Sequence, residues 1–133
     1  GSWNVSNVNG MGNMFYYATA FNQNLENWDV SNVTDMTEMF YHATDFNQDI
    51  GSWNVSNVNG MSNMFYIATS FNQDIGSWNV SNVLSMHSMF YYATAFNQNL
   101  ENWDVTRVEQ CDGFSTDAIS WTLPKPNFTS CTE

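Results

Sequence analysis

The stretch that decides the fold is residues 53–77, WNVSNVNGMSNMFYIATSFNQDIGS, because nearly the same 25 residues recur along most of the chain. A tryptophan opens each copy, at Trp3, Trp28, Trp53, Trp78 and Trp103. Counted from that tryptophan as position 1, positions 9 and 12 are Met, positions 13 and 19 are Phe, and positions 20 and 21 are Asn and Gln in the first four copies. A fixed period of this length is typical of proteins built from stacked copies of one unit.

Two hydrophobic periodicities share each copy. Positions 9, 12, 13 and 16 follow the i, i+3, i+4, i+7 spacing of one face of a short helix. Positions 1 and 3 are apolar and flank a polar residue, as in a strand. Neither element can bury its apolar side alone, so neighbouring copies must bury it. We therefore predict an α/β solenoid of five 25-residue turns, with short helices and short parallel strands about 4.8 Å apart.

Like residues should then form columns through the stack. The repeated Met and Trp side chains are interpreted as core, with the indole N–H bonded to a neighbouring copy. The repeated Asn22-Gln23 pair predicts either a column that binds a ligand or an amide ladder that bonds backbone groups of adjacent copies. We favour the ladder, because backbone polar groups at a tight corner need partners.

The repeat decays near its C-terminal end, and residues 1–106 and 107–133 are predicted to be a repeat region and a cap. Cys111 and Cys131 both lie in the cap. A disulfide between them would contribute roughly 3 kcal/mol and indicates an oxidising compartment. Trp121, outside the repeat register, should cover the last copy together with Leu123 and Phe128. The N-terminal end has no equivalent cover and could support self-association.

Charge excludes several classes of partner. The chain has 13 acidic residues, a net charge of -11, and only two basic residues, Arg107 and Lys125. Nucleic-acid binding needs more cations than this, and so does a polybasic membrane contact. No run approaches the roughly 20 apolar residues of a membrane span. No signal peptide is visible, so the chain is interpreted as a mature fragment of a secreted or surface protein.

No pattern predicts catalysis, so we expect a protein that is not an enzyme. His42 and His87 fall at unrelated repeat positions, and no glycine-rich phosphate loop is present. No cofactor is expected; the alternative is Ca²⁺ held by the carboxylates of Glu26 with Asp29 and of Glu101 with Asp104.

The motif V-S-x-V-x-x-M-x-x-M-F-x-x-A-x-x-F-N-Q-[ND]-I resembles that of the short-repeat bacterial surface lipoproteins, a divergent leucine-rich-repeat group related to the BspA-like surface proteins. In that family an Ala-Phe pair stands where Met14-Phe15 stands here, and the small residue that follows matches Ala18. The resemblance covers about residues 1–110 and implies a right-handed, leucine-rich-repeat-like solenoid at a bacterial cell surface. It further implies adhesion or protein interaction, with no active-site residues to carry over.

Two surfaces are candidate binding sites. The first is the polar face of the predicted strands, at Ser2, Asn4, Asn27, Asp29, Ser52, Asn54, Ser77, Asn79, Asn102 and Asp104. The second is position 15 on the helix side, at Tyr17, His42 and Tyr92. We predict a non-enzymatic extracellular module that binds a protein or glycan through a flat polar strand face. An ice-binding solenoid and a self-assembling surface array are the alternatives.

Overall fold

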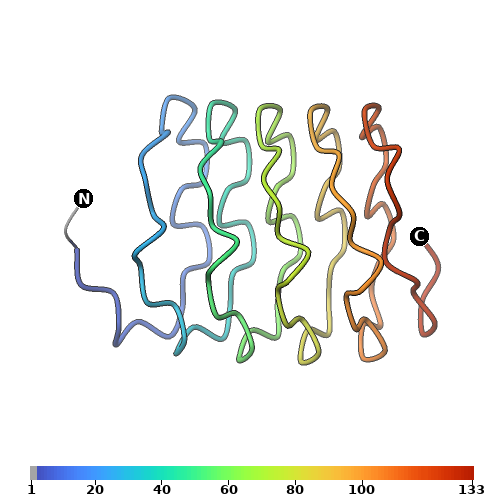
Figure 1. Ribbon diagram of the computed structural model, residues 1–133, viewed down its shortest axis with the longest axis horizontal. Helices are drawn as coiled ribbons and strands as arrows, with labels where there is room; N and C mark the ends of the chain where they lie inside the picture. Colours follow the sequence, from blue (N-terminus) through green and yellow to red (C-terminus); the bar gives the residue numbers. More distant parts are fainter. Residues whose placement is uncertain (1–2) are drawn as a thin grey trace.

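Successive copies of the repeat lie side by side as five layers, with the two termini at opposite ends (Figure 1). The computed structural model describes residues 3–133. Layers 1 to 5 begin at Trp3, Trp28, Trp53, Trp78 and Trp103. Position 8 forms an unbroken file of isolated parallel bridges from layer to layer, through Gly10, Asp35, Gly60, Ser85 and Gln110.

The predicted α/β solenoid with short helices and parallel strands is wrong. Residues 3–133 contain no helix, and β pairing in them is confined to the single-residue bridges at position 8. The leucine-rich-repeat-like architecture implied by the family resemblance is wrong for the same reason. The rest of each layer consists of tight turns and extended connections.

Left-handed residues explain why no helix forms. Position 11 and position 15 of every layer have positive φ, in a region that breaks a helix. In layer 2 these residues are Glu38 and His42, at φ 58° and 59°. Their N–H groups donate across to layer 3, to the carbonyls of Ser62 and Tyr66, at 3.0 and 2.7 Å.

The intervening N–H groups close turns within the layer. Met39 N–H bonds the carbonyl of Met36 at 3.2 Å, and Ala43 N–H bonds that of Phe40 at 3.1 Å. Each closes a three-residue step of the kind found in β-turns. The helix-like spacing of apolar residues therefore arises from consecutive turns that alternate with bonds to the next layer.

The core consists of aromatic and methionine columns, as predicted. Phe40 and Phe65 stack with ring centroids 5.6 Å apart, and Phe46 and Phe71 stack at 5.9 Å. Met36, Met61 and the alanine at position 16 of the inner layers are fully buried beside them. No layer has a core of its own, so burial depends on the neighbouring layers.

The tryptophans form a second column whose hydrogen bonds confirm the predicted role of the indole. Trp53, Trp78 and Trp103 donate their Nε1–H to the carbonyls of Leu25, Ile50 and Ile75, each at 3.0 Å. Centroids of Trp53 and Trp78 are 6.5 Å apart with nearly parallel planes. The predicted strand at positions 1 to 3 is absent, and these side-chain bonds join the layers there instead.

The predicted amide ladder is confirmed. Asn22 Oδ1 accepts hydrogen bonds from the N–H of Asn47 and from Nε2 of Gln48, both at 2.9 Å. The pattern continues to Asn97, whose Oδ1 accepts from the N–H of Thr122 at 2.9 Å. A second ladder, which we did not predict, runs along position 5, where each Asn donates to the preceding layer until Arg107 ends the row on Asn82.

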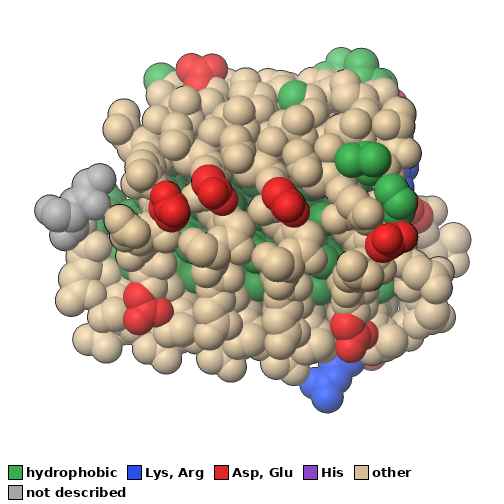
Figure 2. All heavy atoms as spheres, viewed as in Figure 1, with side chains coloured by type: hydrophobic (Ala, Val, Ile, Leu, Met, Phe, Trp, Pro, Cys, Tyr) green, Lys and Arg blue, Asp and Glu red, His purple; other side chains and the backbone are tan. Residues whose placement is uncertain are grey.

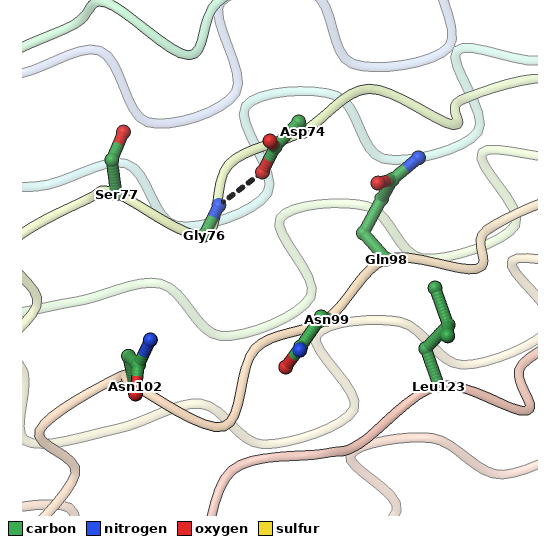
Figure 3. A pocket seen from close by; sticks show the side chains of 7 residues that line it. All are labelled: Asp74, Gly76, Ser77, Gln98, Asn99, Asn102 and Leu123. Atoms are coloured by element: carbon green, nitrogen blue, oxygen red, sulfur yellow. Dashed lines mark hydrogen bonds between the residues drawn. The ribbon is translucent and has the colours of Figure 1, made fainter.

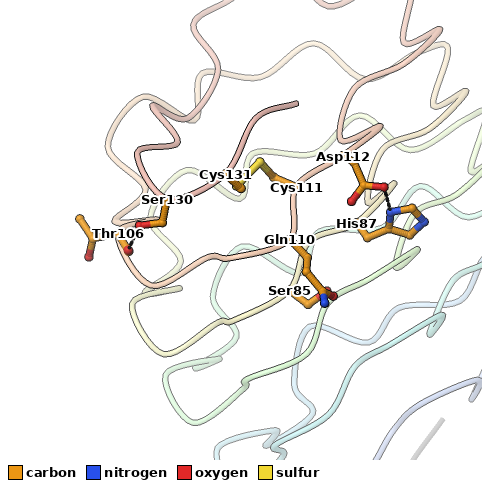
Figure 4. The surroundings of a disulfide bond; sticks show 8 residues. All are labelled: Ser85, His87, Thr106, Gln110, Cys111, Asp112, Ser130 and Cys131. Carbon is orange, nitrogen blue, oxygen red and sulfur yellow. Dashed lines mark hydrogen bonds and ion pairs between the residues drawn. A yellow bond between two sulfur atoms is a disulfide. The ribbon is translucent and has the colours of Figure 1, made fainter.

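The cap contains the predicted disulfide between Cys111 and Cys131 (Figure 4), with Cα atoms 5.9 Å apart. The expectation that Trp121 lies outside the repeat register is wrong. It occupies position 19 and packs against Phe96 with centroids 4.8 Å apart. Phe128 packs edge-on against Phe114 at 5.0 Å, whereas Leu123 remains 43% exposed. The last layer is thus covered by the fifth repeat's own aromatics and a disulfide-bonded tail.

Glycine substitution tests the left-handed turns. Ile67 has φ 54°, a conformation that costs a residue with a Cβ about 1–2 kcal/mol. We therefore expect Ile67→Gly to have a free energy of unfolding about 1 kcal/mol higher than Ile67→Ala. Thr69 has no positive φ, so there the glycine variant should be the less stable of the pair. Urea titration measures the unfolding free energy of all four variants. If glycine were more stable than alanine at both sites, or less stable at both, the assignment of left-handed backbone to Ile67 would be contradicted.

The tryptophan column offers a second test. Trp78→Phe removes the donor to the Ile50 carbonyl and leaves that acceptor buried, so we expect a loss of about 1–3 kcal/mol in unfolding free energy. Trp28 Nε1 is buried without a hydrogen-bond partner, so Trp28→Phe loses no such bond and should cost less. Denaturant unfolding of both variants at low protein concentration provides the comparison. Equal losses would show that the indole bonds contribute little.

Candidate binding site

The polar face predicted as a strand is a row of Asx turns. At position 2 the Asn or Asp side chain is exposed, and its Oδ1 accepts the N–H of position 4. Asn79 accepts both the N–H and the hydroxyl of Ser81, at 3.1 and 2.6 Å. Asn4, Asp29, Asn54 and Asp104 make the equivalent turn. One oxygen of each side chain is therefore used to hold the backbone.

The predicted residues at position 25 lie beside this row and are exposed. They are Asn27, Ser52, Ser77 and Asn102. Ser2 lies outside the described residues. The structure thus places the predicted polar residues at the surface, but on turns rather than on a flat strand.

Two of these turns contain carboxylates with altered acidity. The Ser31 hydroxyl, and after it the Ser31 N–H, stabilise ionised Asp29 and hold the pKa of that carboxyl below its usual value. Thr106 lowers the pKa of Asp104 in the same way, with a smaller contribution from Arg107. Both carboxylates are fully exposed, so they remain ionised across the neutral range.

A polar pocket of about 360 Å³ opens where layers 3 and 4 meet the cap (Figure 3). Its lining residues are Asp74, Gly76, Ser77, Gln98, Asn99, Asn102 and Leu123. The sequence predicted Ser77 and Asn102 as binding residues, and the structure adds the other five. The pocket therefore joins side chains from positions 21, 22 and 25 with one residue of the tail.

Glycine at position 24 lets the layers approach at this pocket. A Cβ on Gly76 would come within 2.8 Å of the Asn99 carbonyl oxygen. The Gly76 N–H bonds Asp74 Oδ1 at 2.9 Å, which fixes the carboxylate at the rim. Position 24 is Gly in layers 2 and 3 but Glu in layers 1 and 4. The change from Gly in layer 3 to Glu in layer 4 is the sequence signal by which the pocket could have been found.

Several polar groups in the pocket keep unused bonding capacity. Gln98 donates its Nε2 to Asn72 Oδ1 at 3.0 Å, which orients the amide and leaves its oxygen available. Asp74 uses only Oδ1 in its turn. Ser77 donates a long bond of 3.4 Å to the Gly51 carbonyl. The pocket therefore offers a carboxylate, three amides and a hydroxyl.

The tyrosines at position 14, next to the second predicted surface, form an aromatic stack rather than an open platform. The position-14 rings of Tyr16, Tyr41, Tyr66 and Tyr91 stack with centroids 4.8, 4.6 and 4.7 Å apart. Burial, followed by the neighbouring Tyr66, raises the pKa of Tyr41. These ring faces cover one another, so the position-14 tyrosines pack between layers.

The position-15 residues do not form one continuous patch. Tyr17 and His42 stack at 4.4 Å, with planes 9° apart. Tyr92 is separated from them by Ile67 and lies 6.4 Å from Tyr91. Position 15 therefore offers no continuous row of rings on which a ligand could stack.

The acidic residues form no metal site in the described structure. Within residues 3–133 no three His, Cys, Asp or Glu side chains come together as metal ligands. No third metal ligand therefore joins the pair Glu26 and Asp29 or the pair Glu101 and Asp104. Asp29 and Asp104 already accept hydrogen bonds within their own Asx turns. Calcium binding stays a prediction that these contacts do not strengthen.

One side-chain trio has the elements of a hydrolytic triad. His87 Nδ1 lies 2.7 Å from Asp112 Oδ2 (Figure 4), and its Nε2 lies 3.4 Å from the Ser88 hydroxyl. The His87 contact lowers the pKa of Asp112. However, Ser88 is buried, and its Oγ lies against Gly113 of the next layer. A nucleophile must reach its substrate, so the trio serves to join layers 4 and 5.

The acidity of Asp29 is open to direct measurement. Ser31→Ala removes the hydroxyl that contributes most to its depressed pKa, so we expect the Asp29 pKa to rise toward its ordinary value. In the wild type this favourable contact is present at neutral pH and is lost as pH falls through the folded-state pKa. Carboxyl NMR titration measures the change. Ser56→Ala, beside the uncharged Asn54, is the control and should leave Asp29 unchanged.

Comparison with known proteins identifies the family of this chain. Among the described residues, no helix has both the length and the apolar character that crossing a membrane requires. No curated protein and no solved structure matches the chain. The family described as "Mycoplasma protein of unknown function, DUF285" matches residues 1–103 and, in an overlapping alignment, residues 27–125. The match covers more than half of the chain, so the chain belongs to the DUF285 family, a bacterial repeat family.

Proposed function

We propose that this chain is a non-enzymatic extracellular binding module that recognises a neutral glycan through the pocket between layers 3 and 4 and the cap. The observation that carries the proposal is the convergence of Asp74, Ser77, Gln98 and Asn102 on one open cavity of about 360 Å³. Binding sites of this kind combine a concave shape with a few convergent polar groups.

The chemistry of the lining suits sugar hydroxyls. A carboxylate, amides and a serine hydroxyl can each accept or donate to the adjacent hydroxyl groups of a sugar ring. Leu123 is 43% exposed at the same pocket and offers apolar contact for a C–H face of the ring. A basic ligand is less well matched, because Asp74 is the single carboxylate among the lining residues.

The framework would hold these groups in place before binding. Gln98 is fixed by the amide ladder and Asp74 by its Asx turn. Groups that are already ordered lose little conformational entropy when a ligand binds. A rigid stack therefore compensates for a pocket that contains few apolar contacts.

The disulfide and the family support a location outside the cell. A structural disulfide is typical of an oxidising environment, and the family is bacterial. The resemblance of the repeat motif to short-repeat bacterial surface lipoproteins favours display at the cell surface and a role in adhesion. The alternative is that the same pocket binds a protein, and a glycan screen distinguishes protein binding from glycan binding.

The ice-binding alternative receives less support from the contacts. Its best candidate column is the threonine at position 17, as in Thr44 and Thr69. The Thr44 hydroxyl donates to the Thr19 carbonyl at 3.3 Å, and the Thr69 hydroxyl donates to the Thr44 carbonyl at 3.5 Å. These hydroxyls bond between layers instead of facing ordered water.

Glycan binding is tested with an array of neutral oligosaccharides, followed by calorimetry on any that bind. Ser77→Ala and Asn102→Ala should each weaken binding about 3- to 10-fold, the equivalent of one hydrogen bond. Asp74→Asn keeps the turn, since Asn occupies this position in layers 1 and 4, and reports the contribution of the charge. Repeating the titrations with a chelator tests any need for Ca²⁺.

Ser52→Ala is the matched control. Ser52 occupies the same repeat position one layer earlier and lies outside the pocket, so its loss should leave affinity unchanged. Equal weakening by Ser52→Ala and Ser77→Ala would move the site to the whole polar face. Binding of peptides but no oligosaccharide would overturn the glycan assignment.

A further inference from the structure

The tail of the cap, residues 123–133, forms one wall of the polar pocket. Leu123 lines the pocket, and its N–H donates to Asn97 Oδ1 at 3.0 Å. The carbonyl of Pro124 accepts the N–H of Leu100 at 2.9 Å. The tail therefore runs directly beside the part of layer 4 that supplies two of the lining side chains. Its position determines the shape of the pocket on this side.

Beyond Pro124 the tail has little hold of its own on the stack. Within residues 3–133, no backbone N–H or carbonyl of residues 125–133 pairs with another backbone group. Side-chain contacts hold this segment instead: Phe128 packs on Phe114, and the Ser130 hydroxyl donates to a carbonyl of layer 5 at 3.0 Å. Most residues of the segment are exposed. Segments with exposed backbone and few buried contacts open at a low free-energy cost.

The ring beneath the tail also lacks a bond that the inner layers have. Lys125 Nζ lies 5.5 Å from the ring centroid of Trp121, whose Nε1–H is buried without a hydrogen-bond partner. The indoles of Trp53, Trp78 and Trp103 each bond a carbonyl. A buried donor without a partner is destabilising. The closed cap therefore carries a cost that the inner layers do not.

The Cys111–Cys131 disulfide is the covalent bond that holds the tail across layer 5. Cys111 is fully buried, whereas Cys131 is half-buried. A dithiol reductant can therefore attack Sγ of Cys131. The S–S bond breaks and the reductant closes into its own disulfide. Two electrons and two protons pass to the protein, which then has two thiols. The tail is left on layer 5 by non-covalent contacts alone.

Charge selects the kind of thiol that reaches this bond. Figure 2 shows acidic side chains spread over the visible face of the stack, and the net charge of the chain is -11. Asp112 follows Cys111 in the sequence, and Glu133 lies two residues after Cys131. An anionic thiol is repelled by such a surface. A neutral dithiol is therefore the class of reductant that fits.

We propose that the Cys111–Cys131 disulfide is a redox latch that regulates glycan binding at the polar pocket. The latch rests on the binding function proposed above. In the oxidised chain the tail is closed and Leu123 completes the pocket. Reduction frees the tail, withdraws Leu123 from the bound sugar and lowers the affinity, while the repeat layers stay folded through their own bonds. By linkage, a bound glycan holds the tail closed and makes the disulfide harder to reduce.

Amide hydrogen exchange tests the latch without any ligand. Exchange at Leu100, which bonds the Pro124 carbonyl, should accelerate about 10-fold or more when dithiothreitol reduces the chain. Glu109 is the internal control, because its N–H bonds the Leu84 carbonyl within the stack at 2.9 Å and should keep its protection. Unchanged exchange at Leu100 after complete reduction would overturn the proposal. Loss of protection at both amides would do the same, because the stack itself would then have unfolded.

Calorimetry with an oligosaccharide that binds the oxidised chain connects the latch to the pocket. Reduction should weaken binding about 3- to 10-fold, the equivalent of losing the apolar contact of Leu123. Leu123→Ala should weaken the oxidised chain by a similar factor, and reduction should then have no further effect. The double variant Cys111→Ala with Cys131→Ala has an open tail without any reductant and should match the reduced wild type.

Two results separate the latch from the function on which it rests. If the oxidised chain binds a glycan and reduction leaves the affinity unchanged, the latch is wrong and the binding function stands. If no oligosaccharide binds the oxidised chain, the binding function fails and regulation of it fails too. Exchange at Leu100 then still reports whether the tail opens.

Discussion

The alternation of backbone hydrogen bonds between and within layers is the interaction on which the rest of the structure depends. N–H groups at positions 9, 11, 13 and 15 bond the next layer, while those at positions 12, 14 and 16 close turns in their own layer. This alternation requires left-handed residues at positions 11 and 15. A buried backbone group must find a partner, and four of these seven N–H groups find it in the neighbouring copy.

That dependence on the neighbour explains the strict 25-residue period. A bond from one layer to the next demands the same backbone path in both, and the side chains then fall into columns of like residues. Phe, Trp and Tyr rings repeat at centroid separations between 4.6 and 6.5 Å. An insertion in one copy would shift every column above it, so its effect would extend well beyond one layer. Interfaces between neighbours, rather than a central core, supply the stability of such a chain.

The polar pocket arises where the layer pattern stops. At the C-terminal end the tail leaves the pattern after Thr122, and the polar pocket opens beside Leu123. Between the ends, polar side chains such as Asn22 and Asn79 are used in ladders and turns. Polar groups that remain free to bind a ligand therefore lie where the repeat pattern ends.

The sequence by itself determined the period, the aromatic and methionine columns, the amide ladder at Asn22, and the pairing of Cys111 with Cys131. The period, columns and ladder follow from which residues recur, because like positions must meet when copies stack. The cysteine pairing follows from the presence of just two cysteines, both in the non-repeating segment. Only the tertiary structure decided that Met36, Met39 and Phe40 lie on consecutive turns instead of a helix. Their spacing fits both, and the choice depends on whether backbone N–H groups bond within the copy or across to the next one. The pocket at Asp74 and Asn102 was decided in the same way, since its residues come from two layers and a tail whose path no repeat pattern predicts.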